Sequence, residues 1–104
     1  MTTQPVNASG TPSIRLSGAL DSAAVPAVWN SVRAQLISGA IVRVDLSAIE
    51  EIDSSALAMI ADWAGEADRQ GARLVLEQVP AKLVALARIS DLEPLLRRLG
   101  SAAV

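Results

Sequence analysis

The sequence predicts an α/β domain, with a mixed but mostly parallel sheet of about four strands and about four helices. Two observations support this class. Short β-branched or alternating apolar stretches take turns along the chain with longer stretches whose apolar residues recur every three or four positions. Strands that alternate with helices are joined by right-handed crossovers and therefore lie parallel. The 104 residues fit one compact domain, and no linker or repeat divides them.

Three strands are expected from the pattern of apolar residues. The stretch 14–17 alternates apolar and polar residues and could enter the sheet antiparallel, whereas 41–46 is β-branched and bounded by Gly and Ser. A third strand is expected at 73–77. Residues 1–12 are small and polar with Gly and Pro breakers, which predicts a flexible tail or at most a weak edge strand. The domain itself is therefore expected over residues 13–104.

Each predicted helix begins at a capping residue or a proline. The expected starts are Asp21-Ser22, Asp53, Pro80 and Ser90-Asp91. Glycine is the residue that most often ends a helix, and the expected ends are Gly39, Gly71 and Gly100. Residues 101–104 are expected to be a frayed end.

The composition narrows the classes of function. Apolar residues make up 51% of the chain, but there is no Phe or Tyr and only two Trp, so aliphatic side chains must fill the core. The net charge is −2 and the basic residues are scattered, which argues against nucleic-acid binding. The lack of Cys and His excludes disulfides, thiolate or imidazole metal sites and imidazole catalysis. No signal peptide follows Met1 and no apolar run could span a bilayer, so we expect a cytoplasmic protein without direct membrane insertion.

Carboxylates offer the main route to an enzyme site. Asp45 and Asp53 follow one strand, where ligands bind in α/β folds, and with Asp21 they could hold Mg²⁺ as in a phosphoacceptor receiver domain. Such a site also needs a lysine after the next strand, but the chain has 78–80, Gln-Val-Pro, there. There is no Walker-type phosphate loop. We therefore interpret Asp45 as a solvent-facing residue and Asp53 as a helix cap, and expect no catalysis, metal or cofactor.

The start of the helix expected after Asp53 is the candidate functional corner. Asp53 is suited to cap it, and Ser54 and Ser55 add two hydroxyls that capping does not require. A phosphoryl group on Ser55 or Ser54 would add about −1.5 to −2 charge. Together with Glu50 and Glu51, in an expected acidic loop, it would repel a docked partner. The competing interpretation is that the corner is only a cap.

The same helix has apolar residues on two sides. At 100° per residue, one set points inward, and it comprises Leu57, Ile60, Ala61 and Ala64. A second set falls more than a quarter-turn away, and it comprises Ala56, Met59 and Trp63. This second set is either an exposed docking patch, for which Trp and Met are favoured, or a surface covered by a neighbouring helix. The sequence leaves both possibilities open.

Several of these stretches resemble the STAS domain, which has the SpoIIAA-like α/β fold. They are 16–21 (Leu-Ser-Gly-Ala-Leu-Asp), 44–47 (Val-Asp-Leu-Ser) and 52–57 (Ile-Asp-Ser-Ser-Ala-Leu), and the resemblance extends from about Ile14 to Leu99. In one branch, the anti-sigma factor antagonists, an Asp-Ser-Ser-Gly-Leu stretch is phosphorylated on its second serine by a partner kinase. Ser55 matches that serine, whereas Ala56 replaces the glycine.

Other stretches resemble the MlaB-type branch, the small STAS subunit of a bacterial phospholipid-transporting ABC transporter. They are Val28-Trp29, Gln70-Gly71, 79–83 and Leu86-Ala87. In addition, Ser54 stands where that branch has a threonine at the contact with the ATPase. The resemblance implies a non-catalytic subunit, peripheral to the inner-membrane complex, that binds and stabilises or regulates the cytoplasmic ATPase. Its expected partner-binding residues are Asp53, Ser54, Ser55, Ala56, Met59 and Trp63. The alternative is an anti-sigma factor antagonist switched by serine phosphorylation, with an anti-sigma factor serine kinase as its partner.

Overall fold

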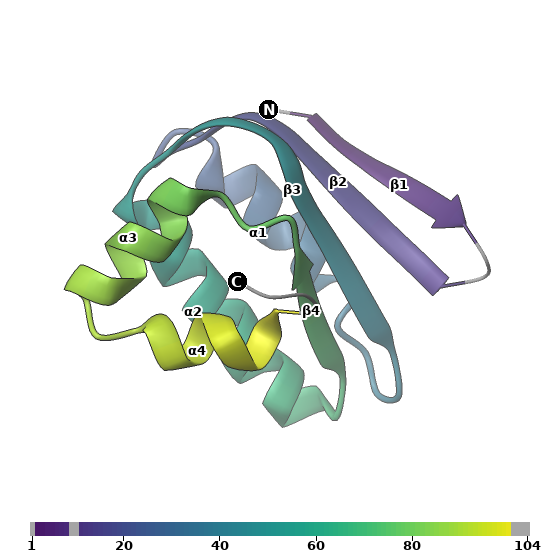
Figure 1. The fold of residues 1–104 in the computed structure, drawn as a ribbon. Coiled ribbons are helices and arrows are strands. Elements are labelled where there is room, and N and C mark those ends of the chain that lie inside the picture. Colours follow the sequence, from purple (N-terminus) through teal and green to yellow (C-terminus); the bar gives the residue numbers. More distant parts are fainter. Residues whose placement is uncertain (1, 9–10, 101–104) are drawn as a thin grey trace.

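The computed structural model describes residues 2–8 and 11–100 and shows a sheet packed against helices (Figure 1). The elements in chain order are β1 (Thr2–Ala8), β2 (Thr11–Leu20), α1 (Val25–Arg33), β3 (Ile41–Ile52), α2 (Ser54–Gln70), β4 (Arg73–Glu77), α3 (Ala81–Ile89) and α4 (Glu93–Leu99). The strand order across the sheet is β1-β2-β3-β4. The strands β2, β3 and β4 are parallel, and β1 pairs antiparallel with β2. The predicted class, a mostly parallel sheet with four helices, is confirmed.

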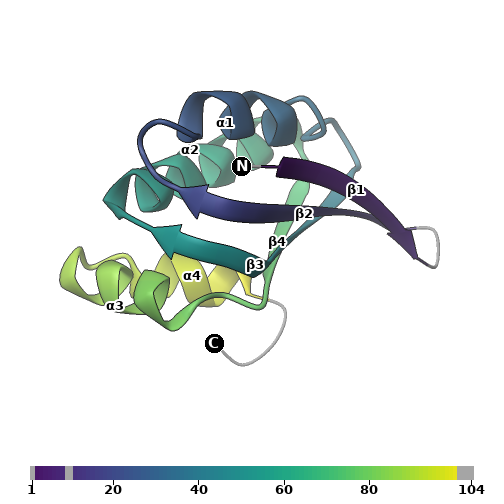
Figure 2. The same ribbon diagram turned by 90° about the horizontal axis from the view of Figure 1, so that it is seen from above.

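The helices lie to one side of the strands in Figure 1, and Figure 2, seen from above, separates α1 and α2 from α3 and α4. Consecutive parallel strands are neighbours, and crossovers of one hand between such strands place their helices on the same face. The burial pattern of β3 agrees, because Val42, Val44 and Leu46 are buried whereas Arg43 and Asp45 on the other face are partly exposed. One face of the sheet therefore belongs to the core, and the other carries charged side chains.

The core is built mainly from aliphatic side chains, as the composition predicts. Buried residues from β2, β3, β4 and all four helices form one continuous cluster. Its largest fully buried side chain is Trp63 on α2, and the partly buried Trp29 of α1 packs against the cluster. The helix α2 therefore lies at the centre of the helical layer, in contact with α1, α3 and β4.

The strand β3 is longer than the sequence predicted. The expected strand ended at Leu46, with an acidic loop before the helix, but β3 continues to Ile52. The prediction of a loop at Glu50 and Glu51 is therefore wrong, although both side chains are exposed. The physical reason is that β2 also runs on. Its last residues pair with Ala48, Ile49, Glu51 and Ile52, and Glu50 is the extra residue at the second of two register shifts.

The N-terminal segment contains an edge strand. Residues 2–8, which the sequence predicted to be a flexible tail or a weak edge strand, form β1 along the free side of β2. Of the two expectations, the structure has the edge strand for these residues, because backbone pairing with β2 does not require an apolar side-chain pattern. The boundary of the domain at residue 13 remains a prediction. The frayed end expected at 101–104 lies outside the described residues.

Three helix boundaries differ from the prediction. The helix α1 starts at Val25 without a side-chain cap, and the expected cap residue Asp21 instead accepts from Ala23 and Ala24 in the preceding turn. The helix α1 ends at Arg33 and not near Gly39, although Leu36 in the following turns is still buried. The expected cap at Ser90-Asp91 is wrong, since Ser90 closes α3 and α4 starts after Leu92 without a side-chain cap. The end of α1 was misplaced because the turns that follow it continue the helical spacing of buried apolar residues as far as Leu36.

Candidate functional site

The corner between β3 and α2 is organised by Asp53. Its backbone is extended, its N–H donates to the Leu20 carbonyl at 3.3 Å, and its Oδ1 accepts from the Ser55 N–H at 2.8 Å. These contacts confirm that Asp53 caps α2. Hydrogen bonds from the Ser55 hydroxyl and then from the Ser55 N–H hold the pKa of Asp53 below its ordinary value. The carboxylate is therefore ionised at neutral pH and is engaged with its own helix.

A second turn lies beside this corner, where β2 leads into α1. Asp21 Oδ1 accepts from the N–H groups of Ala23 and Ala24, both at 3.1 Å. The Asp53 N–H donates to the carbonyl of Leu20, the last residue of β2, so the two turns are adjacent, and the N–H of Ser22 also helps to lower the pKa of Asp53. The corner is therefore a pair of adjacent turns at the carboxyl ends of neighbouring parallel strands, where binding sites collect in α/β folds.

The three aspartates considered for Mg²⁺ do not form one site. Asp45 lies on the open sheet face, where it pairs with Arg15 at 3.3 Å and accepts from the Ser47 N–H at 2.8 Å. Partial burial would raise the pKa of Asp45, but the hydrogen bonds from Ser47 and Arg15 outweigh it and lower the pKa. Asp21 and Asp53 cap separate turns. Within residues 2–8 and 11–100, no three acidic side chains gather as metal ligands would.

The two serines of the corner differ in exposure. The Ser54 side chain is exposed, whereas Ser55 is partly buried and bonded to Asp53. Ser54 is the first residue of α2, so its hydroxyl lies at the helix start in contact with solvent. Of the two hydroxyls, that of Ser54 is therefore the more accessible to another protein.

The expected docking patch on α2 is buried, and this prediction is wrong. Ala56 and Trp63 are 0% exposed and Met59 is 2% exposed. The helix α1 packs on this side, and Trp63 Nε1 donates to the Trp29 carbonyl at 3.2 Å. The alternative that a neighbouring helix covers these residues is correct. None of the three can touch a partner without a rearrangement of the core.

The free side of α2 consists of other residues. Ser54, Ala58 and Asp62 are all exposed and are spaced four apart, so they form one ridge along the helix. The helix α3 starts at the same edge of the sheet, because β3 and β4 are parallel, and it exposes Ala81 and Ala85. Sequence reasoning missed this ridge, although its signal was present as small or acidic residues at i, i+4 and i+8.

The exposed side chains around the corner are mostly acidic or small. Glu50 and Glu51 at the end of β3 and Asp62 on α2 are exposed. The small side chain of Ala58 leaves the ridge without bulk. Such a surface suits the approach of another macromolecule with basic groups, because complementary charge steers association and small side chains allow close contact. It has few of the convergent polar groups of a small-molecule pocket.

Comparisons with known proteins define the class. Residues 4–97 match the family described as "Mlab, STAS domain", and the chain therefore belongs to this MlaB-type STAS domain family. STAS domain proteins are generally non-catalytic and act through protein–protein interaction. No curated protein is significantly similar to the chain. None of the helices in the described part of the chain is long and apolar enough to cross a membrane.

Solved structures share the fold at low identity. The anti-sigma factor antagonist SpoIIAA in its unphosphorylated form matches with a TM-score of 0.72 and 21% identity, over 99% of this chain and 89% of that chain. The Bacillus cell fate determinant SpoIIAA in its phosphorylated form matches with a TM-score of 0.69 and 21% identity, over 99% and 92%. A STAS domain protein from Planctomyces limnophilus, described as an anti-sigma-factor antagonist, matches with a TM-score of 0.70 and 12% identity, over 89% and 85%. At these identities the likeness supports the fold alone.

Proposed function

We propose that the protein is a non-catalytic subunit that binds the cytoplasmic ATPase of a phospholipid-transporting ABC transporter and stabilises or regulates it. It would work at the cytoplasmic side of the membrane, peripheral to the transporter. The match of residues 4–97 to the MlaB-type family supports this partner. The observation that carries the contact site is the exposed Ser54 hydroxyl on a helix start that Asp53 already caps.

The contact surface we propose has two parts. The corner of Asp53, Ser54 and Ser55 contributes a hydroxyl and a fixed carboxylate, and the ridge of Ala58 and Asp62 extends it along α2. The carboxylates favour a basic patch on the ATPase. Ala56, Met59 and Trp63 support the surface from beneath, because they hold α2 against α1.

The alternative function is that of an anti-sigma factor antagonist switched by phosphorylation. It is favoured by the fold shared with SpoIIAA, one form of which is phosphorylated, and by the position of Ser55 in the corner. A phosphoryl group of about −1.5 to −2 charge on Ser55 would replace its hydrogen bond to the Asp53 carboxylate with repulsion. On Ser54 the same group would face solvent and change the surface without breaking the cap.

Recovery of the natural partner distinguishes the two functions. The full chain with an affinity tag is isolated from the cells that encode it, and bound proteins are identified by mass spectrometry. We expect an ABC-type ATPase. Recovery of a serine kinase without any ATPase would refute the proposal in favour of the antagonist function.

A titration of the purified partner then tests the corner. Ser54→Glu adds charge and bulk at the proposed contact and is expected to weaken binding strongly. Ser90→Glu is the matched control, because Ser90 is also exposed but lies between α3 and α4. Equal affinities for the two variants would mean that the corner is only a cap. Unchanged melting temperatures confirm that neither variant disturbs the fold.

A further inference from the structure

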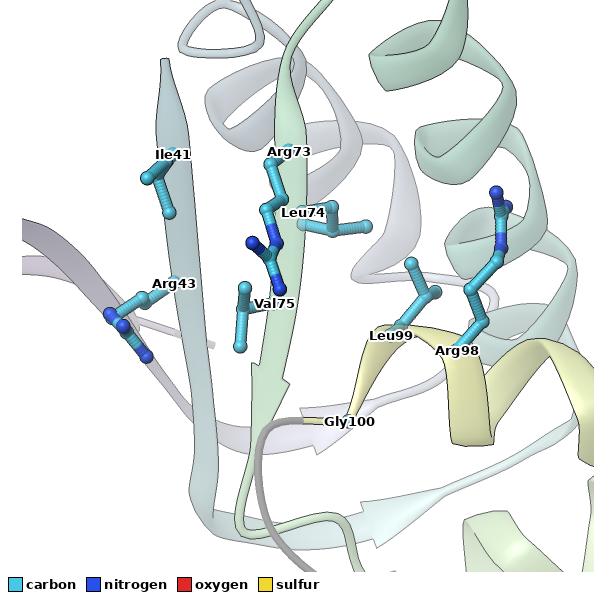
Figure 3. Close-up of a pocket in the computed structure, with 8 residues that line it drawn as sticks. All are labelled: Ile41, Arg43, Arg73, Leu74, Val75, Arg98, Leu99 and Gly100. Atoms are coloured by element: carbon cyan, nitrogen blue, oxygen red, sulfur yellow. The ribbon is translucent and has the colours of Figure 1, made fainter.

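A hollow of about 310 Å³ is lined by residues of β3, of β4 and of the end of α4 (Figure 3). Its lining residues are Ile41, Arg43, Arg73, Leu74, Val75, Arg98, Leu99 and Gly100. It continues toward α2 in a second hollow of about 250 Å³, and both include Arg73 and Arg98. Because Ile41 and Arg73 are the first residues of β3 and β4, the hollow lies at the opposite end of the strands from the Asp53 corner.

The hollow is positively charged, although the whole chain is acidic. It contains three of the nine basic residues of a chain with net charge −2. Arg43 pairs with Glu77 at 3.3 Å, and Arg98 makes a long, exposed pair with Asp68 at 3.4 Å. Within the described residues, Arg73 has no acidic partner. Figure 3 places Arg73 between the other two guanidinium groups.

One backbone position of β4 beside these arginines, that of the buried Leu74, lines both hollows. In a parallel pair, alternate residues direct both their N–H and C=O groups to the same side. The Arg73 N–H donates to the Ala40 carbonyl at 2.8 Å, so Arg73 is directed toward β3 and Leu74 toward the outer edge. On that edge Leu76 is already bridged by Gly100, but no described residue pairs with Leu74.

We propose that the outer edge of β4 binds an extended acidic segment of a partner protein. The backbone of the segment pairs with Leu74, and an aspartate or glutamate side chain binds the Arg73 guanidinium, with Arg43 and Arg98 beside it. An exposed strand edge is a template for such pairing, and a guanidinium matches a carboxylate with two parallel hydrogen bonds. Because this surface is remote from the Asp53 corner, both sites can be occupied together.

An acidic peptide fits this site better than a free phosphate or a lipid headgroup. Two of the three arginines are already shared with Glu77 and Asp68, so the site offers one free guanidinium and not a cluster. The apolar part of the lining includes Ile41, which is 44% exposed at the start of β3. A backbone position without a partner on the outer edge among the described residues, and an exposed aliphatic side chain, are features that a peptide uses and an inorganic anion does not.

Fluorescence polarisation with the full chain tests the proposal. The probe is a short labelled peptide of alternating valine and glutamate, and the matched peptides carry glutamine for glutamate or a single backbone N-methyl group. Arg73→Gln is expected to weaken binding of the acidic peptide about tenfold, because the charge-assisted pair with the carboxylate is lost. Asp68→Asn is expected to strengthen it, because Arg98 is released. Arg88→Gln, on α3 and outside the hollow, is the control.

Each outcome decides the proposal. It is supported if the glutamine and N-methyl peptides bind weakly and the Leu74 amide resonance shifts when the acidic peptide is added. Equal binding by Arg73→Gln and Arg88→Gln would overturn it, and so would full binding of the N-methylated peptide. Displacement of the peptide by millimolar inorganic phosphate, or preference for vesicles of anionic phospholipid, would assign the site to a phosphate group instead. A lack of peptide binding up to millimolar concentration would also refute it.

Discussion

Trp63 is expected to hold the helical layer together, and Trp63→Ala tests this directly. The side chain is fully buried, and its Nε1 donates to the Trp29 carbonyl across the contact of α1 with α2. Replacement of a buried tryptophan by alanine removes packing and leaves a cavity, which destabilises a protein by about 3–5 kcal/mol. It also leaves the Trp29 carbonyl without its donor. The loss is large against the about 5–15 kcal/mol that stabilises a typical domain.

The measurement is unfolding in urea followed by circular dichroism, because the substitution itself changes the tryptophan fluorescence. We expect the free energy of unfolding to fall by at least about 3 kcal/mol and the melting temperature by about 12 °C or more. Trp29→Ala is the matched control, since Trp29 is only partly buried and its ring stacks with Arg33 at 5.1 Å. A loss below about 1 kcal/mol, together with weaker partner binding, would mean that Trp63 is a surface contact after all.

Three further predictions test the corner and α2. The pKa of Asp53 is lowered by folding from an ordinary value of 3.8, so its contribution to stability is present above pH 3.8 and is lost as the pH falls through the lower pKa of the folded state. Asp53→Asn keeps a capping side chain but cannot ionise. Urea titrations between pH 2 and 7 should therefore show that the free energy of unfolding of this variant depends less on pH than that of the original chain, and an equal dependence would contradict the prediction. Gly71 has φ +72°, so Gly71→Ala should cost about 1 kcal/mol in urea unfolding, and Gly71→Asn less. If alanine is neutral there, the left-handed cap does not matter. Ala58→Trp should block ATPase binding without loss of stability, whereas Ala34→Trp, at another exposed position, should leave ATPase binding unchanged. Equal affinities of the two variants for the ATPase, measured by calorimetry, would mean that the contact does not include α2.

The exposed charges of the sheet face contribute little to these expectations. Arg15–Asp45 and Arg43–Glu77 are partly exposed pairs on the face that the helices do not cover. Pairs of this kind typically contribute about 0–1 kcal/mol. Their importance is for recognition, because they determine which guanidinium groups remain free for a partner.

Local signals in the sequence predicted much of the fold correctly. The β-branched run that begins at Ile41, the cap at Asp53 and the left-handed Gly71 each depend on residues within one or two turns of the chain. A cap binds its own helix and a left-handed residue needs only its own freedom of φ. Such features could be predicted because the atoms that decide them are close in sequence.

Other features depended on distant parts of the chain. The sequence left both possibilities open for Met59 and Trp63, and α1 decides between them by covering that side of α2. The sequence predicted an acidic loop at Glu50 and Glu51, whereas pairing with β2 extends β3 to Ile52. The basic hollow joins arginines at positions 43, 73 and 98, which no spacing in the sequence connects.

The sequence by itself determined where β3, α2, β4 and α3 begin, that Asp53 caps α2 and which side of β3 is apolar. The tertiary structure decided which helix faces are covered, how far β3 extends and which charges share one surface. The physical reason is the range of the interactions. Capping and backbone preferences act between near neighbours, whereas burial and charge clustering depend on where remote segments are placed.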